Sequence, residues 1–110
     1  MTTRLDGRTR ALFEARARIL KALAHPTRLF VVDELSHCER CVCDLQKMIG
    51  ADMSTVSKHL AVLRDAGIVT ARKSGNQVFY ALRVPCVTDF FGCVEKVLRQ
   101  SATETIELLE

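Results

Sequence analysis

The sequence predicts a mainly α-helical fold with one small β-hairpin. Over most of the chain, apolar residues recur three and four positions apart, the spacing that gathers them on one face of a helix. Between residues 77 and 82 they alternate instead, and the Gly75-Asn76 pair just before suits a tight turn with positive φ. A length of 110 residues allows one small domain, so we expect a single domain over 1–110, with 1–8 and 101–110 as peripheral tails.

Two helices are predicted at the start of the chain, over residues 9–24 and 26–36. His25-Pro26 separates them, because proline suits the first position of a helix, where its missing N–H costs nothing. Leu29, Val32 and Leu35 should form a short apolar face of the second helix, and we expect Phe30 and Val31 to be buried too. The first helix carries an apolar stripe formed by Leu12, Ala15, Ile19, Leu20, Ala22 and Leu23.

A connector over residues 36–43 should lead into two further short helices. The third helix is expected over 44–49 and should end at Gly50, since glycine accepts the left-handed conformation cheaply. Asp52 can cap the fourth helix, because its carboxylate can accept a backbone N–H of the first turn. Gly67 should stop that helix, with Ile68 packing behind it. The inward face of the fourth helix is expected to hold Val56, Leu60 and Leu63.

The hairpin is predicted from strands at 69–72 and 77–82, and a last long helix over 87–100 follows it. The apolar stripe of this helix is wide for a terminal element, so we expect it to pack, together with Leu12, against a second copy of the chain. The stripe consists of Phe90, Phe91, Val94, Val97 and Leu98. The run Ser101-Ala-Thr-Glu104 resembles a capping box and predicts a short separate helix at the end.

Charge and cysteine content narrow the class of function. The net charge is only +3, but residues 54–83 hold five basic side chains against Asp65 alone, which suggests contact with an anion such as phosphate. Five cysteines in a chain without an apparent export signal argue against a disulfide framework and favour metal binding or redox chemistry. No apolar run is long enough to span a membrane, so we expect a cytoplasmic protein.

A helix, a short turn, a second helix and then a basic hairpin form the order of a winged helix-turn-helix, whose second helix enters the major groove of DNA. Because the apolar face of the fourth helix turns inward, its polar first turns are left to face the groove. Basic side chains there can neutralise phosphates. The candidate DNA contacts are Met53, Ser54, Ser57, Lys58, His59 and Arg64 on the helix, and Arg72, Lys73, Asn76 and Gln77 on the hairpin.

Four segments carry a family resemblance: KALAHPTRL at 21–29, CVCDL at 41–45, STVSKHLAVLRDAGIV at 54–69 and QVFYAL at 77–82. Together they resemble the ArsR/SmtB family of metal-responsive repressors, over roughly residues 18–83. The resemblance implies a homodimer built on the first and last helices, which binds a palindromic operator in double-stranded DNA and leaves it when its ligand binds. DNA binding would need no cofactor. An enzyme is not expected, since the chain lacks a glycine-rich phosphate loop and the βαβ context of a thioredoxin-like motif.

The run from Cys41 to Leu45 resembles the arsenite-sensing branch of that family. In that branch a third cysteine commonly follows the leucine, whereas this chain has Gln46 there, and Cys38 upstream is the candidate substitute. Trivalent arsenic and antimony favour three thiolates in a pyramid, and soft thiolates are the ligands that a soft ion prefers. We therefore predict As(III) or Sb(III) as the inducer, bound by Cys38, Cys41 and Cys43.

The spacing of these cysteines predicts how binding would release DNA. Residues two apart point to different sides of a helix, so Cys41 and Cys43 cannot both reach one ion in helical geometry. Capture of an ion should therefore distort or prevent helix near residues 38–43, which lead into the third helix and so position the fourth. The ion would then favour the conformation that does not bind DNA.

The cysteines also fit several alternatives. Cys86 and Cys93 lie seven residues apart on one helix face, and one of them could supply the third thiolate, including from the other subunit. Cd(II) or Pb(II) could use the same thiolates, with His37 as an extra ligand. A thiol redox or polysulfide switch at Cys41 or Cys43 would release DNA without a metal.

Overall fold

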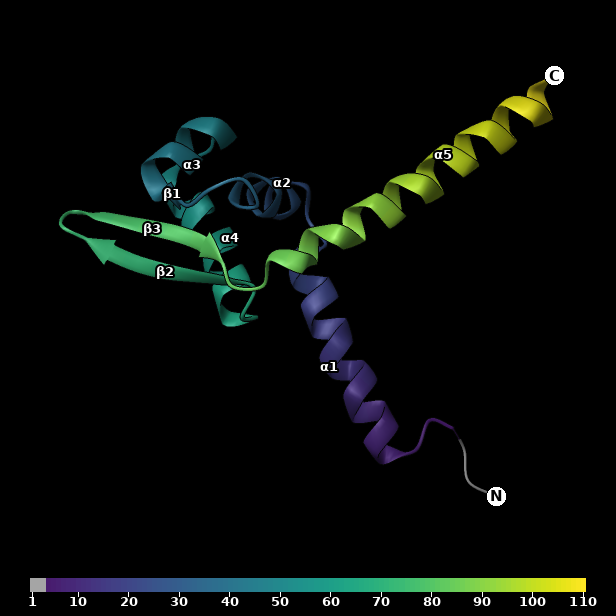
Figure 1. The fold of residues 1–110 in the computed structure, drawn as a ribbon, viewed down its shortest axis with the longest axis horizontal. Helices are drawn as coiled ribbons and strands as arrows, with labels where there is room; N and C mark the ends of the chain where they lie inside the picture. Colours follow the sequence, from purple (N-terminus) through teal and green to yellow (C-terminus); the bar gives the residue numbers. More distant parts are fainter. Residues whose placement is uncertain (1–3) are drawn as a thin grey trace.

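The computed structural model describes residues 4–110 and confirms a mainly helical fold with a small sheet (Figure 1). Of the tail expected over 1–8, residues 1–3 lie outside the described part, and the first helix already begins at Gly7. The elements are α1 (Gly7–Leu23), α2 (Pro26–Leu35), β1 (Arg40–Cys41), α3 (Val42–Ile49), α4 (Met53–Asp65), β2 (Val69–Ser74), β3 (Gln77–Leu82), the 3₁₀ turn η1 (Pro85–Thr88) and α5 (Asp89–Leu109).

The core lies where α2, α3 and α4 meet the sheet. The predicted inward face of α4 is confirmed, because Val56, Leu60 and Leu63 are all at most 1% exposed. Leu45 of α3 is also completely buried against this cluster, which fixes α3 on α4. The expectation that Phe30 is buried is wrong: its side chain is 39% exposed, because it points away from the core that its neighbour Val31 fills.

Two predicted glycine helix ends are confirmed, and they fix the geometry of the helix-turn-helix. Gly50 follows α3 with φ 76° and its N–H donates to the carbonyl of Gln46. After α4, Gly67 has φ 79°, the N–H of Ile68 donates to the carbonyl of Leu63, and Ile68 is buried. This is the Schellman arrangement, in which a left-handed residue lets the chain turn back and satisfy the last carbonyls of the helix.

In the described part of the chain the sheet has three strands, in the order β1-β3-β2, and not the two of the predicted hairpin. β2 pairs with β3 from Val69 opposite Leu82 to Ser74 opposite Gln77, and Gly75, with φ 61°, opens the two-residue turn between them. The connector expected over 36–43 was wrong in its second half, because Arg40 and Cys41 pair with β3 and α3 begins at Val42. A strand of two residues is too short to show a pattern in the sequence.

The short separate helix predicted at Ser101–Glu104 is also wrong. α5 runs without interruption from Asp89 to Leu109, so residues expected to form a peripheral tail continue the helix. No glycine or proline follows Gly92 to stop it. The hydroxyls of Thr103 and Thr105 donate back to the carbonyls of Arg99 and Ser101, four residues earlier, and so lie along the helix instead of capping a new one.

α1 and α5 project from the body of the molecule in different directions (Figure 1). The radius of gyration is 17.8 Å, whereas a compact chain of this length has about 13 Å. α5 is 21 residues long and has no buried residue. Both observations indicate that these two helices have surfaces available for a partner. None of the helices described between residues 4 and 110 has the length and apolar character of a membrane span.

Candidate DNA-binding surface and thiol segment

The first turns of α4 present a polar surface, as the sequence predicts. Asp52 precedes the helix as its N-cap residue, but its carboxylate accepts the hydroxyl of Ser54 at 2.7 Å and makes no side-chain cap to the backbone. This hydrogen bond is the main reason that the pKa of Asp52 is lowered. The candidate contacts Met53, Ser54, Ser57, Lys58 and Arg64 are exposed. They are therefore available to a DNA groove and its phosphates.

His59 differs from the other candidates on α4, because it is half-buried against α2. Its ring lies 4.3 Å from that of His25, and its Nδ1 lies 3.3 Å from Nη1 of Arg28. An arginine can only donate, so Nδ1 of His59 accepts and the imidazole is neutral. Burial, followed by the nearby His25 and Arg28, lowers the pKa of His59. His59 thus joins α4 to α2.

Arg28 connects three helices, a role that no local sequence pattern predicts. Its Nε donates to the carbonyl of Ala22 at 2.6 Å and its Nη2 to that of Lys21 at 3.4 Å, so it satisfies carbonyls at the end of α1. Nη1 of the same guanidinium reaches His59 on α4. Only the tertiary arrangement brings residues 31 positions apart together here.

The hairpin of β2 and β3 forms the wing. Lys73, Asn76 and Gln77 are exposed at its tip. Arg72, farther down β2, is bound by Glu39: Nη2 lies 2.5 Å from Oε1 and Nε lies 3.3 Å from Oε2. The Arg72 guanidinium lies 4.9 Å from the centroid of the Phe79 ring. The hydrogen bond from Arg72 lowers the pKa of the Glu39 carboxyl.

The three predicted thiol ligands lie on the segment that enters both the wing sheet and α3. Cys41 is buried, pairs with Phe79 through β1, and its Sγ accepts the backbone N–H of Asp44 at 3.3 Å as the N-cap of α3. Cys38 is exposed in the bend before β1, and Cys43 is exposed inside α3. Within residues 4–110, no three His, Cys, Asp or Glu side chains are gathered closely enough to hold a metal ion.

The two remaining cysteines lie elsewhere in the chain. Cys86 is in the η1 turn and Cys93 is in the first half of α5, and both are exposed.

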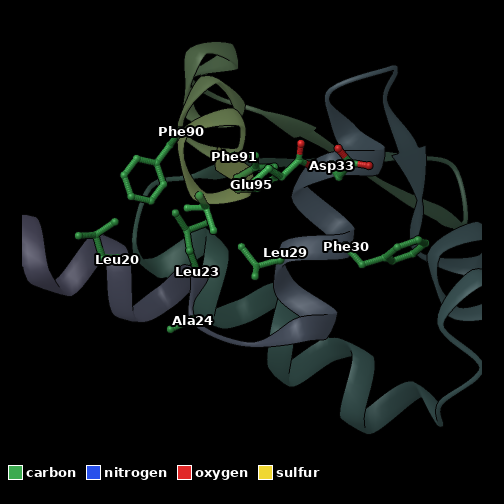
Figure 2. Close-up of a pocket in the computed structure, with 10 residues that line it drawn as sticks. Leu20, Leu23, Ala24, Leu29, Phe30, Asp33, Phe90, Phe91 and Glu95 are labelled. Atoms are coloured by element: carbon green, nitrogen blue, oxygen red, sulfur yellow. The ribbon is translucent and has the colours of Figure 1, made fainter. Parts of the chain in front are cut away.

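An apolar groove of about 640 Å³ lies between α1, α2 and α5, and Figure 2 shows side chains from all three helices around it. Of the predicted dimer residues, Phe90, Phe91 and Val94 line it. Leu12, Val97 and Leu98 do not line it but are 50%, 62% and 64% exposed on α1 and α5. Together they leave a large apolar surface on the two projecting helices, which is typical of an interface with another chain.

Comparison with known proteins identifies the family. The chain is 33% identical over 100 residues to an uncharacterised HTH-type transcriptional regulator of Mycobacterium tuberculosis, Rv0081, an alignment that covers 90% of this chain and 88% of that protein. Residues 25–71 match the family described as bacterial regulatory protein, arsR family. The chain belongs to the ArsR family. Members of this family are DNA-binding transcriptional regulators, so the protein is a regulator and not an enzyme.

Solved structures of similar proteins agree with the fold. The crystal structure of Rv0081 superposes with a TM-score of 0.75 at 32% identity, covering 86% of this chain and 96% of that one. The homodimeric winged helix-turn-helix domain of a possible ArsR-family regulator from Mycobacterium bovis gives a TM-score of 0.74 at 32% identity, covering 91% and 92%. This homodimeric relative, together with the apolar groove, supports a self-dimer that binds DNA.

A further relative matches over a shorter part of the chain. The arsenical resistance operon repressor of Staphylococcus xylosus is 44% identical over 64 residues, which cover 58% of this chain and 62% of that protein.

Proposed function

We propose that this protein is a homodimeric repressor in the cytoplasm that leaves a palindromic operator when Cys38, Cys41 and Cys43 bind As(III) or Sb(III). α4 would enter the major groove through Met53, Ser54, Ser57 and Lys58, with Arg64 and the wing on the flanking backbone. Leu12 and the α5 residues Phe90, Phe91, Val94, Val97 and Leu98 would form the dimer.

The observation that carries the proposal is the position of the thiols. The backbone of Cys41 pairs in the wing sheet and its side chain caps the N-terminus of α3, while Cys43 lies in the first turn of α3. Any ligand that draws these two sulfurs to one point has to change the first turn of α3, because residues two apart diverge on a helix. α3 packs on α4 through the buried Leu45, so such a change would alter the placement of the reading helix.

The donor set fits a thiophilic ion. Three thiolates satisfy trivalent arsenic or antimony and leave no requirement for oxygen or nitrogen ligands. Among residues 4–110 the sulfurs are not gathered at one point, so the ion would bind a rearranged conformation more tightly, and that difference in affinity is what can release DNA. The name of the Staphylococcus xylosus relative, an arsenical resistance operon repressor, gives the proposal independent support.

The test is a competition on DNA. Purified protein bound to a labelled palindromic operator would be challenged with arsenite, antimonite, Cd(II), Pb(II), Zn(II), peroxide and polysulfide. We expect release by arsenite or antimonite at the lowest concentrations. The Cys38→Ser, Cys41→Ser and Cys43→Ser variants should still bind the operator but lose most of the response.

Cys86→Ser and Cys93→Ser are the matched controls, since both remove an exposed thiol outside the proposed site. They should keep the full response to arsenite. If arsenite leaves operator binding of the wild type unchanged, the proposed inducer is wrong. Release by Cd(II) or Pb(II) alone, or by peroxide or polysulfide alone, would assign the same thiols to the other metals or to redox sensing.

A further inference from the structure

Glu39 stands between two of the proposed thiol ligands and binds a wing arginine. Its two carboxylate oxygens accept hydrogen bonds from Nη2 and Nε of Arg72. Two parallel N–H groups of this kind fix both the position and the orientation of the guanidinium. Nη1 of Arg72 is not used by this pair. The residues are 33 positions apart in the chain, so the contact joins the thiol segment to the far side of the sheet.

The sheet provides a second link between the thiol segment and Arg72 of the wing. Cys41 lies opposite Phe79 across β1 and β3, and Arg72 lies opposite Phe79 across β3 and β2. Residues directly opposite in an antiparallel pair point to the same face, so Cys41, Phe79 and Arg72 form a row across the three strands. The Arg72 guanidinium lies 4.9 Å from the centroid of the Phe79 ring in that row.

Ligand capture would act on Glu39 before it acts on the strands. Cys41 is held by its pairing in β1 and Cys43 by α3, whereas Cys38 and Glu39 belong to neither a helix nor a strand. To bring the three sulfurs together, the segment at Cys38 has to move most. Glu39 is its direct neighbour and would move with it.

We propose that Glu39 is a positioning residue that holds Arg72 ready for DNA, and that capture of a thiol ligand withdraws it. This inference rests on the proposed function for its ligand. It adds a route by which the thiol site reaches DNA through the wing, independent of the route through α3 and α4. Arg72 then contacts a phosphate through Nη1, the nitrogen that the Glu39 pair does not use, and Glu39 and the Phe79 ring orient the guanidinium.

The first measurement needs no inducer. Glu39→Gln keeps the shape of the side chain but removes the charge that fixes Arg72, so operator affinity should fall about two- to fivefold, the range that an exposed ion pair supports. In an Arg72→Gln background the same change at Glu39 should have no further effect, because the two residues act as one unit. Thermal unfolding of each variant identifies any general loss of structure.

Glu34→Gln is the matched control. Glu34 also pairs with an arginine of the thiol segment, Arg40, at 3.5 Å, but this pair does not reach β2. The Glu34→Gln substitution removes the same negative charge at a nearby position. Loss of that charge by itself would raise the affinity for DNA slightly, because the phosphates are repelled less. The proposal is overturned if Glu39→Gln binds the operator as tightly as Glu34→Gln does, or more tightly than the wild type does.

The second measurement adds arsenite. The ratio of operator affinities without and with arsenite should be about two- to fivefold smaller for Glu39→Gln than for wild type, because the variant has already lost what the ligand removes. An unchanged ratio together with normal release of the wild type overturns the wing route and leaves the proposed inducer in place. If arsenite fails to release the wild type, the proposed inducer fails, and the affinities measured without inducer still decide the role of Glu39.

Discussion

A Cβ atom at Gly67 would lie 2.9 Å from Nη1 of Arg83. Gly67 ends α4 with φ 79°, and Arg83 follows β3, so this contact closes the corner where the reading helix meets the wing. The backbone agrees, since the N–H of Arg83 donates to the carbonyl of Ile68. The placement of α4 relative to the wing therefore depends on a residue without a side chain.

Gly67→Ala should destabilise the protein by about 1–2 kcal/mol, because an L-residue is disfavoured in the left-handed conformation, and the arginine tip must also move aside. Gly92→Ala is the control: Gly92 lies inside α5, and no heavy atom of the described residues lies within 4 Å of the added Cβ. There alanine should stabilise by about 0.5–1 kcal/mol. Urea unfolding at one protein concentration measures the change in the free energy of unfolding for both variants. Equal shifts of the same sign would contradict this account of Gly67.

The His59–His25–Arg28 contact predicts a dependence of stability on pH. The pKa of His59 is lowered from 6.5 in the folded protein, first by burial and then by its neighbours His25 and Arg28. As the pH falls below about 6.5, His59 takes up a proton in the unfolded chain before it does so in the folded protein. The stability that the neutral His59 ring contributes above that pH is therefore lost. The free energy of unfolding should fall between pH 7.5 and pH 5.5, and His59→Gln should show a smaller fall.

His37→Gln serves as the control for that series, since His37 is exposed in the segment after α2. It should keep the pH dependence of the wild type. A fall of the same size in His59→Gln and in wild type would show that other groups titrate in this range.

Lys58 on α4 should contribute one phosphate contact. Replacing it with glutamine should reduce the slope of log operator affinity against log salt by about 0.9, the value for one neutralised phosphate. Lys96→Gln on α5 removes the same charge from an exposed helix outside the proposed DNA surface, and should leave the slope unchanged. Fluorescence anisotropy between low and moderate salt gives both slopes. Equal slopes for the Lys58 variant and wild type would remove Lys58 from the interface.

The apolar surface of α5 predicts a dimer that a single charge disrupts. Leu98 is 64% exposed, and Leu98→Lys would place a charge in the proposed interface. Sedimentation should then show a larger fraction of single chains than in the wild type. Val62→Lys, at a 38% exposed position on α4, should leave the dimer intact. If Leu98→Lys sediments like wild type, the interface does not include this part of α5.

The sequence predicted the elements whose patterns are local. Val56, Leu60 and Leu63 repeat at helical spacing and are buried, and Gly50 and Gly67 end helices because of a backbone preference that needs no distant partner. The exposed first turns of α4 followed from that inward face. These signals are sufficient for a helix-turn-helix with a wing.

The features that the sequence did not predict depend on contacts between distant residues. β1 is two residues long and forms only because β3 lies beside it, so neither the third strand nor the Glu39–Arg72 pair has a local signature. His59 was expected at the DNA surface, yet it packs against His25, which only the crossing of α2 and α4 could show. The prediction that the last helix ends at residue 100 was wrong, because Ser101 and Glu104 have the spacing of a helix cap but lie within a continuous helix.

The strand order β1-β3-β2 has a consequence for self-association. A sheet edge with unpaired backbone groups can recruit strands from other molecules and start aggregation, and proteins guard such edges by making them short or charged. β1 ends after two residues and turns into α3, while the other edge, β2, carries Arg72 and Lys73. The wing can therefore extend from the body, free of DNA, without offering a template for amyloid-like growth.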